Sequence, residues 1–111
     1  MPCKIFYTPE RLIEELMKRR IVPLEIIKVR MFEDVGYRYL YMFRVSSYEW
    51  WIIDECTDYS GCGSHNREVM EKLVKHYRSI YGKLVKYEEY EVPSKVYHLL
   101  KNTLYEAYKG N

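Results

Sequence analysis

Apolar residues recur at helical spacing in three stretches of the chain, and each stretch predicts an amphipathic helix. The first helix starts at Thr8 as N-cap with Pro9 in its first turn, and its apolar stripe is Leu12, Ile13, Leu16 and Met17. The second stripe is Val69, Met70, Leu73, Val74, Tyr77, Ile80 and Tyr81, and Gly82 suits a left-handed cap after it. The third helix is capped by Ser94, and its expected buried side is Val96, Leu100, Leu104 and Ala107.

The apolar period changes to two between the first and second helices. We expect strands at 24–32, 37–45 and 49–54, joined by tight turns, with Gly36 at positive φ in the first turn. Residues 4–7 are also strand-like, and residues 83–92 predict another strand. Because a long helix precedes this last strand, it can lie parallel to the strand at 49–54 through a right-handed crossover.

The resulting order, (β)αβββαβα, predicts an α+β fold. It consists of an antiparallel three-stranded meander and a fourth strand after a crossover helix, with the helices packed on the sheet. We expect residues 1–111 to form one domain, since no linker or repeat divides them. Both faces of the meander are substantially apolar, which indicates that it is either covered on both sides or shows an aromatic face to a partner.

Composition bears on where the protein acts. The sequence has no apolar run long enough to span a bilayer and no signal-peptide core, so we expect a cytoplasmic protein without a membrane partner. The chain has 13 tyrosines, one alanine and no glutamine, and it is rich in charged residues, a trend found in proteins from hot environments. In this respect it resembles small proteins of thermophilic archaea and their viruses, which would place a viral protein in the host cytoplasm.

The formal net charge of +2 is too small to indicate a class of partner, so only local clusters of charge are informative. Lys18, Arg19 and Arg20 make the end of the first helix basic. Positive charge there suits the helix dipole, and the alternative is a patch that steers a phosphate-bearing partner.

The segment from Asp58 to Arg67 is a candidate anion site, because it joins a strand to a helix. Two glycines allow the backbone to approach a ligand, and the free N–H groups of a helix start carry partial positive charge. The alternative is a tight turn with an ordinary N-cap. The candidate ligand-binding residues are Ser60, Gly61, Cys62, Gly63, Ser64, His65, Asn66 and Arg67.

Three strands, a G-x-G turn, a helix, a strand and a final helix with Leu104-Tyr105-Glu106 near its end follow one another in the C-terminal part of the chain. This order resembles the core of GNAT-type acetyltransferases. The resemblance implies that Ser60 to Ser64 would bind the pyrophosphate of acyl-CoA, and that Tyr105 would act as general acid. The chain departs from the family at Asp58, where the family carries Arg or Gln, and it stops before the family's final strands.

The same loop contains residues for other kinds of site, but none of these sites has a complete set of ligands or catalytic partners. Cys56, Cys62 and His65 lack an obvious fourth zinc ligand, and the two cysteines could instead form a disulfide. Cys62 near a helix start could be an activated nucleophile, and Asp54, Glu55 and Asp58 could bind a divalent metal. Because no set is complete, we expect no metal, no cofactor and no catalytic residue.

Tyrosines at alternate positions of the middle strand are the second candidate site. Such a row can stack bases, and it is also typical of a strand buried under a helix. The candidate partner face is Tyr37, Tyr39 and Tyr41 with Arg38 and Arg44. The sequence therefore favours a small non-catalytic binding protein that acts on a protein or a nucleic acid, with dimerisation possible through the tyrosines. The alternative is a small enzyme that binds an anionic ligand at Ser60–Arg67, in its most specific form an acyl-CoA transferase.

Overall fold

The computed structural model describes residues 3–33, 36–54 and 63–109, and these residues form an α+β fold. Its strands are β1 (Cys3–Phe6), β2 (Glu25–Glu33), β3 (Gly36–Arg44), β4 (Trp50–Asp54) and β5 (Lys86–Glu91). Its helices are α1 (Pro9–Lys18), α2 (Gly63–Tyr81) and α3 (Ser94–Lys109). The predicted order of elements is confirmed, including the first strand.

The five described strands form one mixed sheet in the order β1-β4-β3-β2-β5. β3 is antiparallel to both of its neighbours, whereas β1 pairs with β4, and β5 with β2, in parallel. Four strands therefore run in one direction, and their last residues share one end of the sheet, the carboxyl end. The turn between β2 and β3 lies there as well, and so do the starts of all three helices. The opposite end is called the amino end.

The pairing of the last strand differs from the expectation. β5 is parallel to β4 in direction, but it pairs with β2 at the far edge of the sheet, and β1 takes the place beside β4. The physical reason is that β4 is already paired on both sides, with β1 and β3, so that β5 pairs at the edge that β2 offers.

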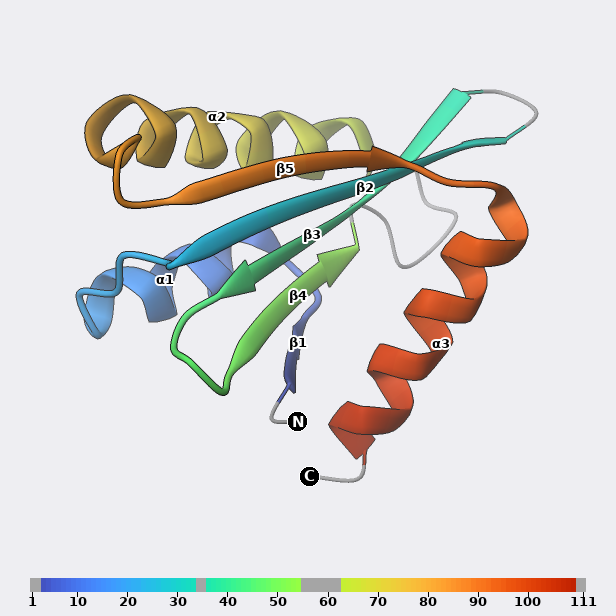
Figure 1. Cartoon of the computed structure of the whole chain (residues 1–111), viewed down its shortest axis with the longest axis horizontal. Coiled ribbons are helices and arrows are strands. Elements are labelled where there is room, and N and C mark those ends of the chain that lie inside the picture. The colour runs from blue at the N-terminus through green and yellow to red at the C-terminus, as the bar shows by residue number, and fades with distance from the viewer. Residues whose placement is uncertain (1–2, 34–35, 55–62, 110–111) are drawn as a thin grey trace.

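Helices cover both faces of the sheet. α1 and α2 lie on one face and α3 lies on the other (Figure 1). Alternation along β4 supplies both cores, because Trp51 and Ile53 pack under α1 and α2 while Ile52 packs under α3. The two apolar faces predicted for the meander are thus explained mainly by coverage on both sides.

The expected turn and cap chemistry is confirmed at two positions and wrong at a third. The Thr8 hydroxyl accepts a hydrogen bond from the Arg11 amide, and Gly36 has φ +149°. Gly82 does not adopt the expected left-handed conformation, and its lack of a side chain serves a close approach, since a Cβ there would lie 2.5 Å from the Arg78 carbonyl oxygen. The left-handed residue at a helix end is instead Arg20, at φ 54°.

The burial predicted for the apolar stripes of the helices is confirmed at most positions and is wrong at three. Met17, Ile80 and Val96 were expected to be buried, but they are 53%, 60% and 46% exposed. In α3 the buried position is Tyr97 rather than Val96, because the helix meets the sheet one residue further around its axis. None of the described helices is both long and apolar enough to cross a membrane.

Candidate functional site

The hairpin of β2 and β3 carries aromatic and basic side chains on the face that α2 covers. The strand register places Phe32 opposite Tyr37, and Arg30 opposite Tyr39. Directly opposed residues share a face of the sheet, so these four side chains form two adjacent rungs. We call Phe32, Tyr37, Tyr39, Arg30 and the nearby Arg67 of α2 the hairpin platform.

The aromatic rings form a continuous ladder along the hairpin. The ring centres of Phe32 and Tyr37 are 5.3 Å apart in an edge arrangement. Tyr37 and Tyr39 follow at 6.3 Å, and Tyr39 stacks on Tyr41 at the same spacing. Each separation lies in the range of favourable ring pairs, so neighbouring rings hold one another in place.

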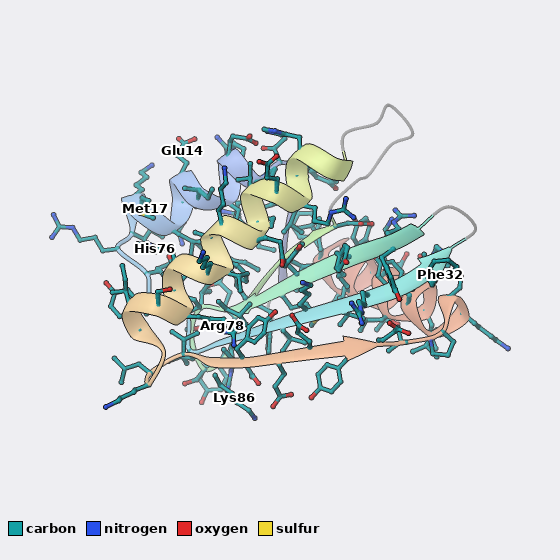
Figure 2. The ribbon with its side chains drawn as sticks, turned by 90° about the horizontal axis from the view of Figure 1, so that it is seen from above. Glu14, Met17, Phe32, His76, Arg78 and Lys86 are labelled. Atoms are coloured by element: carbon teal, nitrogen blue, oxygen red, sulfur yellow. The ribbon has the colours of Figure 1, made fainter. Side chains whose placement is uncertain are left out.

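Exposure rises along the ladder toward the hairpin turn. Tyr41 is fully buried under α2 and Tyr39 is half-buried, whereas Tyr37 is 40% and Phe32 61% exposed. Phe32 lies at the end of the hairpin, beyond the cover of α2 and far from Met17 (Figure 2). Tyr41 therefore belongs to the core, as expected for a strand under a helix, and the accessible part of the tyrosine row is Tyr37 with the edge of Tyr39.

Cations lie over the rings of the platform. The Arg30 guanidinium is 4.7 Å from the centre of the Tyr37 ring, and the Arg67 guanidinium is 5.4 Å from that of Tyr39. Lys28 lies 4.8 Å from the Tyr39 ring on its buried side. The structure thus brings a residue of the predicted loop site, Arg67, onto the predicted tyrosine face.

Carboxylates neutralise most of these cations. Lys28 pairs with Glu71 at 2.8 Å and with Glu89 at 3.5 Å, and Glu71 also accepts a hydrogen bond from the Tyr41 hydroxyl. A hydrogen bond from Tyr87 holds the pKa of Glu89 below its ordinary value, assisted by Lys28. This network fixes α2 to the sheet.

The two arginines of the platform differ in their partners. Arg30 pairs with Glu91 at 3.0 Å, whereas Arg67 has no ion pair with any residue in the described ranges. Arg67 also lies near the start of α2, where the partial positive charge of the helix adds to its own. Of the two arginines, Arg67 is therefore the one whose charge is not offset by a carboxylate among the described residues.

The other residues of the loop site are dispersed. Ser60, Gly61 and Cys62 lie outside the described residues, while Gly63 and Ser64 open α2. Asn66 is buried, and His65 points to α1, where its Nε2 lies 3.1 Å from a Glu10 carboxylate oxygen. The hydrogen bond with His65 lowers the pKa of Glu10.

Arg38 and Arg44 lie on the opposite face of β3, so they do not extend the tyrosine surface. Arg44 donates to the Ser47 carbonyl. Arg38 donates two hydrogen bonds to Asp54, whose side chain is fully buried, and Lys101 of α3 lies 2.8 Å from the same carboxylate. The Tyr97 hydroxyl donates to it as well. Tyr97 and Lys101 were not identified from the sequence, although they are four residues apart on one helix face and form a polar pair beside the apolar stripe.

Tyr105 lies near this buried group without joining it. Its hydroxyl oxygen is buried and makes no hydrogen bond with the described residues, and burial together with the charge of Asp54 raises the pKa of Tyr105 to about 12. Its ring faces the Lys101 ammonium at 5.5 Å. The group around Asp54 has a sufficient structural role, because it joins the last helix to the centre of the sheet.

Comparison with models of known protein families, with curated proteins and with solved structures finds no match. Within the described ranges, no group of three His, Cys, Asp or Glu side chains is placed to hold a metal ion. Cys56, Cys62, Glu55 and Asp58 lie outside those ranges. The geometry of the hairpin platform is therefore the main guide to function.

Proposed function

We propose that this protein is a non-catalytic binding protein whose hairpin platform stacks the bases of a single-stranded nucleic acid. The observation that carries the proposal is the ring ladder, which leaves the core at Tyr41 and ends in two exposed rings with an arginine over each of the last two tyrosines. Exposed aromatic rings beside cations are the combination used to bind unpaired bases without sequence readout.

The exposed apolar surface of Phe32 and the charge of Arg67 both support a single-stranded nucleic acid as the partner. A phenylalanine that is 61% exposed at the end of a hairpin leaves apolar surface in water, and a stacked base would cover it. Arg67, without a carboxylate partner in the described ranges, is available to a phosphate near Tyr39. Arg30 is already paired with Glu91, so we expect affinity to depend more on stacking than on charge.

Fluorescence anisotropy of a labelled oligothymidylate, with a duplex of equal length for comparison, tests the proposal. We expect the single strand to bind more tightly than the duplex. Tyr37→Ala should weaken binding, because base stacking contributes about 1–3 kcal/mol per ring, or roughly 5- to 150-fold in affinity. Arg67→Gln should weaken it less and reduce the salt dependence by about one phosphate contact.

Tyr48→Ala is the matched control, because Tyr48 is 78% exposed in the turn after β3, at the amino end of the sheet. It should leave oligonucleotide affinity unchanged. Absence of binding at low salt, or equal losses in Tyr37→Ala and Tyr48→Ala, would contradict the proposal. Analytical ultracentrifugation of the free protein adds a second check, since a dimer that Phe32→Ala dissociates would make the platform a contact between copies of the chain.

A further inference from the structure

The amino end of the sheet gathers exposed apolar side chains that the hairpin platform does not use. Two lie on helix ends and four lie on the connections beside them. They are Met17 of α1, Ile80 of α2, and Val22, Leu24, Tyr48 and Leu84 of the adjoining turns, with exposures from 37% for Val22 to 78% for Tyr48. No single segment of the chain contains more than three of them.

Backbone contacts show that these segments meet at one end. The Leu24 amide donates to the Arg44 carbonyl at the end of β3, and its carbonyl accepts from the Lys86 amide at the start of β5. The Tyr77 hydroxyl of α2 donates to the Ile21 carbonyl after α1. In Figure 1 the ends of α1 and α2 and the starts of β2 and β5 lie together at the left. The apolar side chains therefore surround the tips of neighbouring turns.

Cations exceed carboxylates at this end. Arg19 pairs with Glu15, and Lys86 lies 3.7 Å from Glu25 and 3.0 Å from Glu88, so these two cations are offset by three carboxylates. Beyond them, Lys18, Arg20, Arg44 and Lys83 make no ion pair with any described residue. Glu14 of α1 and Glu49 before β4 are two further carboxylates, and Glu49 accepts a hydrogen bond from the Trp51 indole.

The backbone conformation of Arg20 is a second sign that positive charge at this end has a role beyond helix stability. It ends α1 in the left-handed conformation, at φ 54°, which is strained for any residue with a Cβ and free of strain for glycine. A cation thus occupies a position that glycine would fill at lower conformational cost. The helix dipole accounts for Lys18 in the last turn, but it does not account for this position or for the exposed leucines.

We propose that the amino end docks on the surface of an anionic lipid bilayer. Apolar side chains on turn tips can enter the boundary between headgroups and acyl chains while the surrounding cations meet anionic headgroups. A nucleic-acid backbone would leave the aliphatic side chains without a contact, and a second copy would bring like charges together. The sequence predicts no membrane partner, because a search for long apolar runs cannot detect a surface assembled from separate turns.

Sedimentation with vesicles tests the proposal. Wild-type protein should bind vesicles of phosphatidylcholine mixed with phosphatidylserine, bind vesicles of phosphatidylcholine alone more weakly, and dissociate as salt is added. Arg20→Gly and Lys83→Gln should each lower partitioning about fivefold, the equivalent of about 1 kcal/mol per cation near an anionic surface. Leu84→Gln should lower it by a similar or larger factor, since the Leu84 side chain is the most exposed leucine of this end.

Leu99→Gln is the matched control, because Leu99 is 67% exposed but lies on α3, away from the amino end. It should leave partitioning unchanged, as should Phe32→Ala at the other end of the sheet. No binding to phosphatidylserine vesicles at low salt would overturn the proposal, and so would equal effects of Leu84→Gln and Leu99→Gln. Release of the protein from vesicles by an oligonucleotide, with Phe32→Ala still released in the same way, would overturn it too, because the amino end would then bind nucleic acid.

Discussion

The two ends of the sheet both expose apolar side chains, but they expose them in different ways. At the carboxyl end the exposed rings continue a buried ladder, and each is held by its neighbour on the same hairpin. At the amino end the exposed side chains come from separate turns, and cations surround them. The first arrangement suits a flat, stacked ligand, whereas the second suits a soft surface that adapts to protruding side chains.

The ends also differ in how charge is buried. Asp54, at the carboxyl end, is fully buried between Arg38 and Lys101. Glu25, at the amino end, pairs with a Lys86 side chain that is 65% exposed. A buried carboxylate depends on its partners, whereas a pair screened by water contributes little. Stability should therefore be far more sensitive to charge removal at the carboxyl end.

The largest expected effect follows from this difference. Asp54→Asn should lower the free energy of unfolding by about 3 kcal/mol, because it leaves the cations of Arg38 and Lys101 without their shared carboxylate. Glu25→Gln should lower it by less than about 1 kcal/mol. Urea unfolding followed by circular dichroism measures both. A second variant, Asp54→Asn with Lys101→Met, should recover part of the loss, and an equal or greater loss would argue against the charge explanation.

Binding at the two ends should separate in a pair of variants. Tyr37→Ala should weaken oligonucleotide binding by roughly 5- to 150-fold and leave vesicle binding intact, because it removes one stacking ring. Leu84→Gln should do the reverse. Anisotropy and vesicle sedimentation on the same preparations make the comparison. Loss of both activities in either variant would show that the two surfaces are not independent.

Arg20→Gly should raise the free energy of unfolding by up to about 1 kcal/mol, because glycine removes the strain of the left-handed conformation at the end of α1. Arg19→Gly is the matched control, since Arg19 has φ −94° and gains no such relief. Thermal and urea unfolding compare the two. If both substitutions destabilise the protein equally, the backbone at Arg20 is not strained.

The smallest expected effect is the pH dependence that Glu89 gives to the free energy of unfolding. The hydrogen bond from Tyr87 lowers the pKa of Glu89 below 4.5, so its contribution to stability is present above about that pH and is lost as pH falls through the lower folded-state value. Glu89→Gln should therefore differ most from wild type near neutral pH and converge with it in acid. Tyr87→Phe should reduce the same pH-dependent difference. Urea unfolding across the acid range measures it, and a constant difference at all pH values would exclude this linkage.

Much of the fold could be predicted from periodicity and cap residues. Thr8 and Gly36 were correctly identified because each acts through its own local geometry. Val96 and Gly82 were not, because burial depends on where a helix meets the sheet and a helix can end without a left-handed glycine. The pairing of β5 with β2 was also not predicted, because a strand that follows a long helix can pair at either edge of the sheet and local sequence does not indicate which.

The candidate site was predicted in parts rather than as a whole. The tyrosine row and Arg67 were both identified, but nothing in their separation along the chain indicates that the Arg67 guanidinium lies over the Tyr39 ring. Arg38 was grouped with the tyrosines as part of the candidate partner face, although alternation along β3 places it on the opposite face, where it donates to Asp54. Which tyrosines remain exposed depends on where α2 begins, a tertiary feature.

By itself, the sequence determined the order of elements, the two apolar faces of the meander and the alternation that separates Tyr39 from Arg38, because these follow from local periodicity and backbone preference. Only the tertiary structure decided that β1 and β5 occupy the edges, that Asp54 is buried between two cations, and that two sets of exposed apolar residues lie at opposite ends of the sheet. Those outcomes depend on contacts between residues far apart in the chain, and local sequence patterns do not indicate which of these contacts form.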